Sequence, residues 1–177
     1  MEDCDTCRGR PLAFGRVAVL GRYEGGLRRA VQRAKFEGEL GAWVWMGKSL
    51  AEVVAAQPWI VAGGVDAVVP VPTSWRARLT RGINPAALLG KAVASRLGKP
   101  IRPWLTRSHA RPQVGLGRAA RLANAEGAFR TVPRAKASGL RLLLVDDVMT
   151  TGATADVCAR ALKMAGALTV DVAVAAR

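Results

Sequence analysis

Runs of apolar residues predict strands at several places along the chain. Residues 16–23 are rich in apolar and β-branched types, residues 65–71 and 140–145 are nearly continuous apolar runs, and residues 168–174 alternate. Continuous runs are typical of strands that are buried on both faces, as in a parallel sheet. Residues 101–105 form a shorter candidate strand.

Between these strands, apolar residues recur at helical spacing. Such patterns predict amphipathic helices over residues 27–35, 43–56, 85–97 and 153–165. The helix over 85–97 opens with Asn84-Pro85, a capping residue followed by proline at the first helical position. The last strand, helix and strand form a right-handed βαβ unit, so we expect an α/β fold built on a central parallel sheet flanked by helices.

One segment has little periodicity. Residues 106–137 contain many arginines, glycines and alanines, and we expect mainly loop there, with a short helix at 117–125 as the alternative for that part.

Length and composition limit the class of protein. The 177 residues suffice for one domain with its own core, and 50% apolar with 23% charged residues excludes a disordered polyelectrolyte. No run of eighteen apolar residues occurs and the amino end is acidic, so we expect neither a membrane span nor a signal peptide. The odd number of cysteines, three, favours a reducing cytoplasm.

The charge is strongly positive and unevenly spread. The net charge is +14, and no acidic residue occurs between Asp66 and Glu126, where eleven lysines and arginines are found. We therefore expect an anionic partner. A phosphate-rich small molecule accounts for some of these residues, and the surplus favours nucleic acid.

The clearest chemistry follows the apolar run 140–145. Asp146 and Asp147 are acceptors suited to vicinal sugar hydroxyls, provided that the strand ends there so that both side chains reach one ligand. The threonines and Gly152 that follow, at the start of the next helix, predict a phosphate cradle. Simple helix capping is the alternative, but capping needs one such residue and this segment has five polar side chains.

The same segment resembles a known motif. Residues 142–154 are similar to the thirteen-residue phosphoribosyl pyrophosphate (PRPP) signature of type I phosphoribosyltransferases, with four apolar residues, two acids and Thr-Thr-Gly-x-Thr. Most of the chain further resembles the ComF family of competence proteins, through Tyr23–Leu27, Lys35–Gly38, Val69–Pro72, Arg81–Asn84, Gln113–Leu116, Arg121, Asn124 and Gly127–Phe129. In one departure, Pro85 stands where that family usually has glutamine.

The resemblance implies a fold, a site and a role. The fold is type I phosphoribosyltransferase-like, with a small N-terminal hood region, over residues 16–177. The PRPP-binding residues are Asp146, Asp147, Val148, Met149, Thr150, Thr151, Gly152, Ala153 and Thr154. The pyrophosphate loop contains Val71, Pro72, Thr73, Ser74, Arg76 and Arg81, and the flexible loop over the site contains Arg107, Arg111, Gln113, Arg118 and Arg121. Magnesium is expected between pyrophosphate and ribose, held by the two aspartates only through the ligand.

The implied role is assistance to single-stranded DNA uptake in natural transformation. Expected partners are PRPP, single-stranded DNA and competence proteins such as the DNA-uptake helicase. Two alternatives stay open: a metabolic phosphoribosyltransferase that releases pyrophosphate as an amine or nucleobase attacks ribose, and a DNA-binding module with a vestigial pocket. Among the tryptophans, Trp75 is the candidate for base stacking, whereas Trp43, Trp45, Trp59 and Trp104 are expected in the core or at its rim.

A cysteine pair near the amino end suggests half a zinc site. Cys4 and Cys7 have zinc-ribbon spacing, and the ComF resemblance implies a four-cysteine module before the transferase domain, of which residues 1–15 are the expected remnant. A structural zinc ion needs four ligands, so zinc binding would require an additional pair. A frayed terminus is the alternative. Cys158 is expected in the core.

Overall fold

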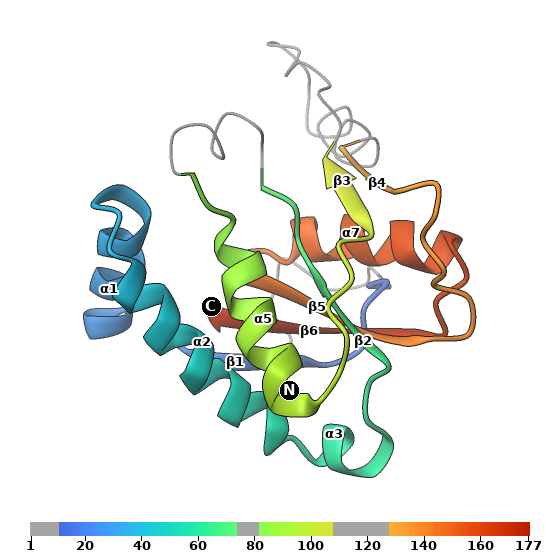
Figure 1. Cartoon of the computed structure of the whole chain (residues 1–177), viewed down its shortest axis with the longest axis horizontal. Helices are drawn as coiled ribbons and strands as arrows, with labels where there is room; N and C mark the ends of the chain where they lie inside the picture. The colour runs from blue at the N-terminus through green and yellow to red at the C-terminus, as the bar shows by residue number, and fades with distance from the viewer. Residues whose placement is uncertain (1–10, 74–81, 108–127) are drawn as a thin grey trace.

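Four parallel strands form the centre of the molecule. The computed structural model describes residues 11–73, 82–107 and 128–177. Within these ranges the sheet has the order β1 (Val17–Gly21), β6 (Thr169–Ala176), β5 (Arg141–Val148) and β2 (Ala67–Pro70), and every neighbouring pair is parallel. The predicted parallel sheet is confirmed (Figure 1).

Helices cover both faces of this sheet. Helices α1 (Gly25–Phe36), α2 (Leu40–Ala55) and α5 (Pro85–Leu97) pack on one face and α7 (Ala153–Met164) on the other, while α3 (Pro58–Gly63) is a short connection. Because successive strand side chains point to opposite faces, Leu142 and Leu144 pack toward α7, and Leu143 and Val145 toward the three-helix layer. Continuous apolar runs therefore supply both cores.

A small second sheet replaces part of the predicted loop. Strands β3 (Leu105–Arg107) and β4 (Phe129–Thr131) pair antiparallel, so within the 106–137 segment the expectation of loop was wrong at residues 106–107 and 129–131. The strand expected over 101–105 was also misplaced, because Ile101 makes only an isolated bridge to Val68. The helix considered at 117–125 lies outside the described residues.

Strand β5 is longer than its apolar run. It continues through both aspartates to Val148, with Asp146 opposite Val174 and Val148 opposite Ala176. The expectation that the strand ends at Val145 was wrong, because β6 extends far enough to keep offering backbone partners.

No helix in the described parts of the chain is both long and apolar enough to cross a bilayer.

Candidate functional site

A polar pocket opens where strands β2 and β5 end. Its volume is about 300 Å³, and its lining includes Val71–Thr73 after β2 and Asp146–Val148 at the end of β5. Helix starts add Thr154 from α7 and Asn84–Ala86 from α5. The carboxyl ends of parallel strands meet at one edge of a sheet, and this edge is where α/β folds bind ligands. We call this the carboxyl-edge pocket.

The two aspartates both reach this pocket although they are consecutive strand residues. The Asp147 amide donates to Asp146 Oδ1 and the Val148 amide donates to Asp147 Oδ1, each at 2.8 Å. Each carboxylate thus folds back toward the following backbone amide. Burial, together with the negative charge of Asp147, raises the pKa of Asp146 to about 7. A carboxyl of raised pKa gains from a ligand that donates hydrogen bonds to it.

A lysine from helix α1 also lines the pocket and pairs with one of the two aspartates. Lys35 Nζ, from the last turn of α1, lies 2.6 Å from Asp147 Oδ2, and the two side chains are only 20% and 18% exposed. Sequence reasoning missed this contact, because helical spacing identified Lys35 only as a polar position. The sequence signal that could have identified Lys35 as a site residue is the segment Lys35–Gly38, which is one of the segments that carry the family resemblance.

A smaller cavity of about 40 Å³ adjoins Asp146 at the start of α7. It is lined by Asp146, Val148, the residues from Met149 to Ala155, and Val174. Gly152, the N-cap of α7, has φ +74°, a left-handed conformation that suits glycine, and an added Cβ would come within 3.4 Å of Phe14. Helix amides and threonine hydroxyls therefore surround a space that fits an anionic group.

The loop after β2 is held by a side chain from α5. Asn84 Nδ2 donates to the Val71 carbonyl at 3.1 Å. Asn84 occupies the N-cap position, as expected, but its side chain makes no capping hydrogen bond. It fixes the entry of the expected pyrophosphate loop instead.

The structure brings together most of the sequence-predicted residues that it describes. Val71, Pro72, Thr73, Asp146, Asp147, Val148 and Thr154 line the carboxyl-edge pocket, and Met149, Thr150, Thr151, Gly152 and Ala153 line the smaller cavity. Ser74, Arg76, Arg81, Arg111, Gln113, Arg118, Arg121, Cys4 and Cys7 lie outside the described residues, as does Trp75.

Arg107 needs a correction. It was expected in a flexible loop, but it is the last residue of strand β3, paired with Phe129 of β4. Its guanidinium lies 5.4 Å from the centroid of the Phe129 ring, and both residues line the carboxyl-edge pocket. Strand pairing and this cation–π contact hold the side chain at the pocket wall.

Two other expectations concern metals and thiols. Among the described residues no three His, Cys, Asp or Glu side chains gather as a metal site. The two pocket carboxylates nevertheless offer the oxygen atoms that Mg²⁺ prefers, and Mg²⁺ is commonly held by one or two carboxylates together with substrate phosphates. Cys158 is fully buried in the core, as expected, and burial raises the pKa of its thiol.

The chain is similar in sequence to a competence protein and to DNA utilization proteins of bacteria. It is 27% identical over 173 residues to competence protein F of Haemophilus influenzae, covering 93% of this chain and 74% of that protein. It is 30% identical over 179 residues to the DNA utilization protein YhgH of Salmonella typhi, covering 96% of this chain and 75% of that protein, with the same figures for Salmonella typhimurium. No family model matches the sequence.

Solved structures show the same fold. Glutamine PRPP amidotransferase of Bacillus subtilis superposes with a TM-score of 0.52 at 24% identity, and an allosteric regulatory enzyme of purine biosynthesis with 0.50 at 26%. Each match covers 75% of this chain but only 25% of the larger enzyme, so this chain spans about a quarter of their length. The type I phosphoribosyltransferase fold is thereby confirmed.

Proposed function

The chain belongs to the ComF family of competence proteins, and on that premise we propose that it binds PRPP and assists the uptake or use of DNA. The names of its relatives, competence protein F and DNA utilization protein, support the role in the uptake or use of DNA. The carboxyl-edge pocket supports the binding of PRPP. Single-stranded DNA and the proteins of the uptake apparatus, such as its helicase, are the partners that this role requires.

One observation carries the proposal for PRPP. The carboxyl-edge pocket, which contains the aspartate pair, and the smaller cavity at the start of α7 have three lining residues in common: Asp146, Val148 and Thr154. The two cavities therefore adjoin. A ribose 5-phosphate has a diol at one end and a phosphate at the other, and it matches this sequence of acceptors followed by donors.

The remaining walls suit the pyrophosphate group. Lys35 and Arg107 bring positive charge to the pocket, and Thr73, which also lines it, can donate hydrogen bonds to a phosphate from its hydroxyl and its backbone amide. Mg²⁺, when bound, would neutralise charge on the pyrophosphate, with Asp146 and Asp147 holding it indirectly through the ligand.

We further propose a cytoplasmic location. Cys158 is a buried free thiol, and the odd number of cysteines in the chain favours a reducing compartment.

The aspartate pair provides the test. Asp146→Asn combined with Asp147→Asn removes both charged acceptors, and we expect PRPP binding with Mg²⁺ to fall below detection in titration calorimetry. A matched control, Glu24→Gln with Glu52→Gln, removes two exposed carboxylates from the helical layer and should bind as the parent chain does. Equal affinity of the aspartate double variant and the control would refute the site.

A second candidate is transfer of the phosphoribosyl group to an acceptor. It is favoured by the similarity, at 26% identity, to an enzyme of purine biosynthesis. In that case the bond between ribose C1 and the pyrophosphate oxygen breaks as an acceptor nitrogen forms a bond to C1. Incubation with PRPP and candidate amines or nucleobases, followed by an assay for released pyrophosphate, separates this enzyme from a protein that only binds PRPP.

A further inference from the structure

A second concave surface lies at the opposite edge of the sheet. Its volume is about 490 Å³, and it is bordered by Asp66–Ala67 at the start of β2 and by Leu140 just before β5. Arg102, Trp104, Arg134 and Lys136 also line it. We call it the amino-edge pocket. The aspartates of the carboxyl-edge pocket lie at the other end of β5, so the two surfaces share no residue.

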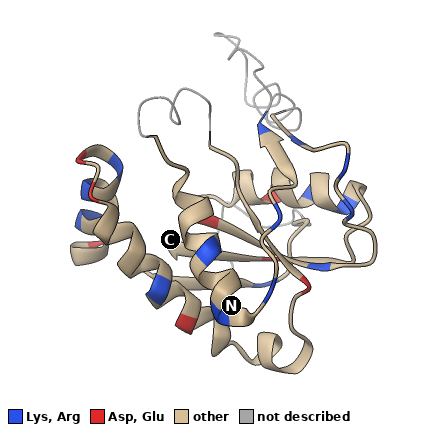
Figure 2. Ribbon diagram, in the orientation of Figure 1, with Lys and Arg blue, Asp and Glu red and all other residues tan. Residues whose placement is uncertain are grey.

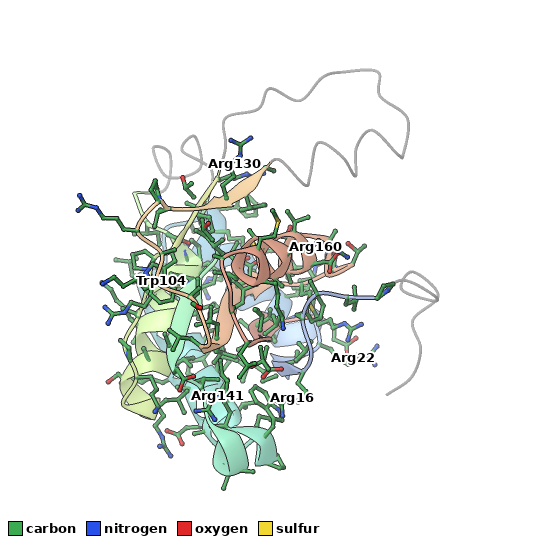
Figure 3. All side chains as sticks on the ribbon, turned by 90° about the vertical axis from the view of Figure 1, so that its right-hand side faces the viewer. Arg16, Arg22, Trp104, Arg130, Arg141 and Arg160 are labelled. Carbon is green, nitrogen blue, oxygen red and sulfur yellow. The ribbon has the colours of Figure 1, made fainter. Side chains whose placement is uncertain are left out.

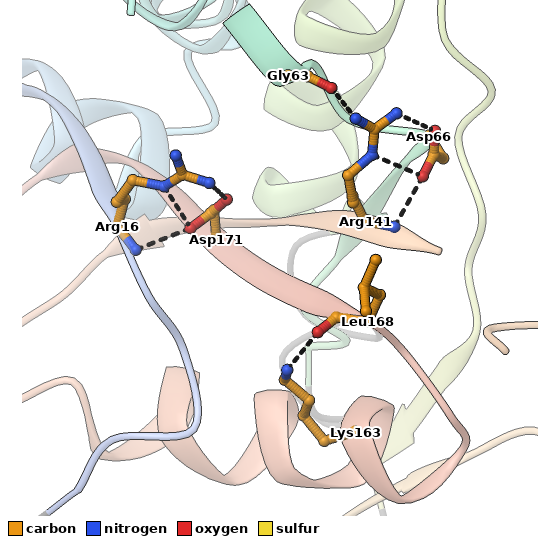
Figure 4. Close-up of polar contacts among 7 residues, drawn as sticks. All are labelled: Arg16, Gly63, Asp66, Arg141, Lys163, Leu168 and Asp171. Carbon is orange, nitrogen blue, oxygen red and sulfur yellow. Dashed lines mark hydrogen bonds and ion pairs between the residues drawn. The ribbon is translucent and has the colours of Figure 1, made fainter. Parts of the chain in front are cut away.

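The amino-edge pocket carries unneutralised positive charge. Arg102, Arg134 and Lys136 are exposed and form no ion pair with any described residue. The one acid in the lining, Asp66, is already occupied, because it accepts hydrogen bonds from the Arg141 backbone amide and from two guanidinium nitrogens at 2.8 to 3.2 Å (Figure 4). Three cations therefore remain available to an anionic partner.

Basic residues continue from this pocket along the chain. Figure 2 shows Lys and Arg recurring between the end of α5 and strand β3, a stretch that contains Lys99, Arg102 and Arg107. Arg130 follows on the paired strand β4. A series of cations is typical of a groove that follows a phosphate backbone, whereas a single small anion needs only one cluster.

Trp104 adds an aromatic surface to these charges. It is half-buried, packs against the core on one side and lines the amino-edge pocket on the other. Its backbone is fixed, because its amide donates to the Arg102 carbonyl and its carbonyl accepts from the Val132 amide, both at 2.8 Å. In Figure 3, nitrogen-tipped side chains project beside Trp104 at the edge of the molecule.

The combination favours an unpaired base. An indole inside a concave site is accessible to a base that has left its stack, whereas a duplex keeps its bases stacked inside the helix. Stacking on an aromatic ring tolerates any sequence, as the handling of incoming DNA requires. An acidic protein segment would satisfy the cations but would leave the aromatic surface without a specific role.

We propose that the amino-edge pocket is a contact site for single-stranded DNA, with phosphates on Arg102, Arg134 and Lys136 and one base stacked on Trp104. The identity of the nucleic acid rests on the proposed role in DNA uptake. The amino-edge pocket shares no lining residue with the carboxyl-edge pocket, so each proposal can fail without the other.

The test compares two charge-matched variants of the full chain. Arg102→Gln with Arg134→Gln and Lys136→Gln removes the three cations of the amino-edge pocket. The control, Arg28→Gln with Lys48→Gln and Lys91→Gln, removes three exposed cations from the three-helix layer. Fluorescence anisotropy with a labelled thymidine oligonucleotide, and with a duplex of equal length, measures affinity over a range of salt concentrations.

We expect the pocket variant to bind single strands about tenfold more weakly, or weaker still. The slope of log affinity against log salt should become shallower by about 2, because each phosphate that is no longer neutralised accounts for about 0.7. The control should stay within twofold of the parent chain. Trp104→Leu should weaken single-strand binding by a further several-fold, whereas Trp45→Leu, at another partly exposed tryptophan, should not.

Three results would overturn the proposal: equal affinity of the pocket variant and the control, equal binding of duplex and single strand by the parent chain, or no effect of the charge variant on DNA together with loss of binding to an acidic peptide. Calorimetry with PRPP separates the two sites. The pocket variant should bind PRPP normally, and Asp146→Asn with Asp147→Asn should bind DNA normally.

Discussion

Lys35 offsets part of the negative charge of the two aspartates in the carboxyl-edge pocket when no ligand is bound. Its ammonium group lies 2.6 Å from Asp147, with both side chains mostly shielded from water. Without this cation, two adjacent carboxylates would share a partly buried space, and their repulsion would be offset only by backbone amides. A diol that donates to Asp147 would release Lys35 toward a phosphate, so one side chain serves both the free and the bound state.

This arrangement makes Lys35→Met a sharp test at the residue scale. The substitution keeps most of the side-chain volume but removes the cation, and the absence of one charge-assisted hydrogen bond, worth about 1.5–3 kcal/mol, corresponds to roughly ten- to a hundredfold weaker PRPP binding. Titration calorimetry measures the change. Lys48→Met, on the exposed face of α2, is the control and should leave the affinity unaltered. An unchanged affinity in Lys35→Met would show that the lysine neutralises the empty pocket only.

At the scale of single elements, hydrogen bonds and ion pairs between side chains and backbone join the strands at their amino ends. Asp66, just before β2, binds both the backbone and the side chain of Arg141 at the start of β5, and Arg141 also donates to the carbonyl of Gly63, the last residue of α3 (Figure 4). On the far side of the sheet, Asp171 of β6 forms the corresponding tie to Arg16 before β1. These side-chain contacts add to the backbone hydrogen bonds at the amino ends of the strands, such as those from the Asp66 amide to the Arg141 carbonyl and from the Val172 amide to the Arg16 carbonyl.

The Asp66 tie predicts a pH dependence of stability. Hydrogen bonds from Arg141 lower the pKa of Asp66 from 3.8 to about 2, so folding favours the ionised form. This contribution is therefore complete above pH 4 and is lost as the pH falls toward 2. Because the side chains of Arg141 and Asp66 are 41% and 29% exposed, we expect a loss of about 1 kcal/mol, less than the shift alone would give.

Urea unfolding of the parent chain and of Asp66→Asn at pH 6 and pH 2.5 measures this contribution. The asparagine variant should be less stable at pH 6, and the gap between the two proteins should narrow at pH 2.5 as the parent loses its charge. A gap of constant size would assign the stabilisation to the hydrogen-bonding geometry and not to the charge.

At the scale of the whole molecule, the helices and strands with a clear apolar pattern could be predicted from the sequence. The unit from β5 through α7 to β6 and the bounds of α5 followed from apolar spacing and, for α5, from the opening residues Asn84 and Pro85. Strand β3 was misplaced and strand β4 was missed, because three residues are too few to show a period.

The candidate site was predicted only in the part that is continuous in sequence. The aspartates and the threonine loop could be identified because they are consecutive. The contact of Lys35 with Asp147 and the wall formed by Arg107 and Phe129 join segments far apart in the chain, and only the fold brings them together. The course of β5 past Val145 depended on the length of its neighbour β6, which local sequence does not specify.

The reactivity of the buried Cys158 thiol measures how often helix α7 separates from the sheet. The residue lies in α7 soon after the cradle at its N-terminus, and its side chain is fully buried against the sheet. A thiol reagent can reach it only when α7 separates from the sheet, and that opening also dismantles the cradle. Ligand that binds the closed form alone must therefore slow the reaction.

In a Cys4→Ser and Cys7→Ser background, we expect PRPP with Mg²⁺ at a hundred times its Kd to slow Cys158 labelling by about a hundredfold, equivalent to about 2.7 kcal/mol of stabilisation. Labelling kinetics with a chromogenic disulfide measure the rate. Adding Asp146→Asn and Asp147→Asn should abolish the protection, because the closed form then gains nothing from the ligand. Rapid labelling of the free protein, at the rate of an unfolded thiol, would contradict the burial of α7. Protection that persists without the aspartates would instead place the ligand away from the end of β5.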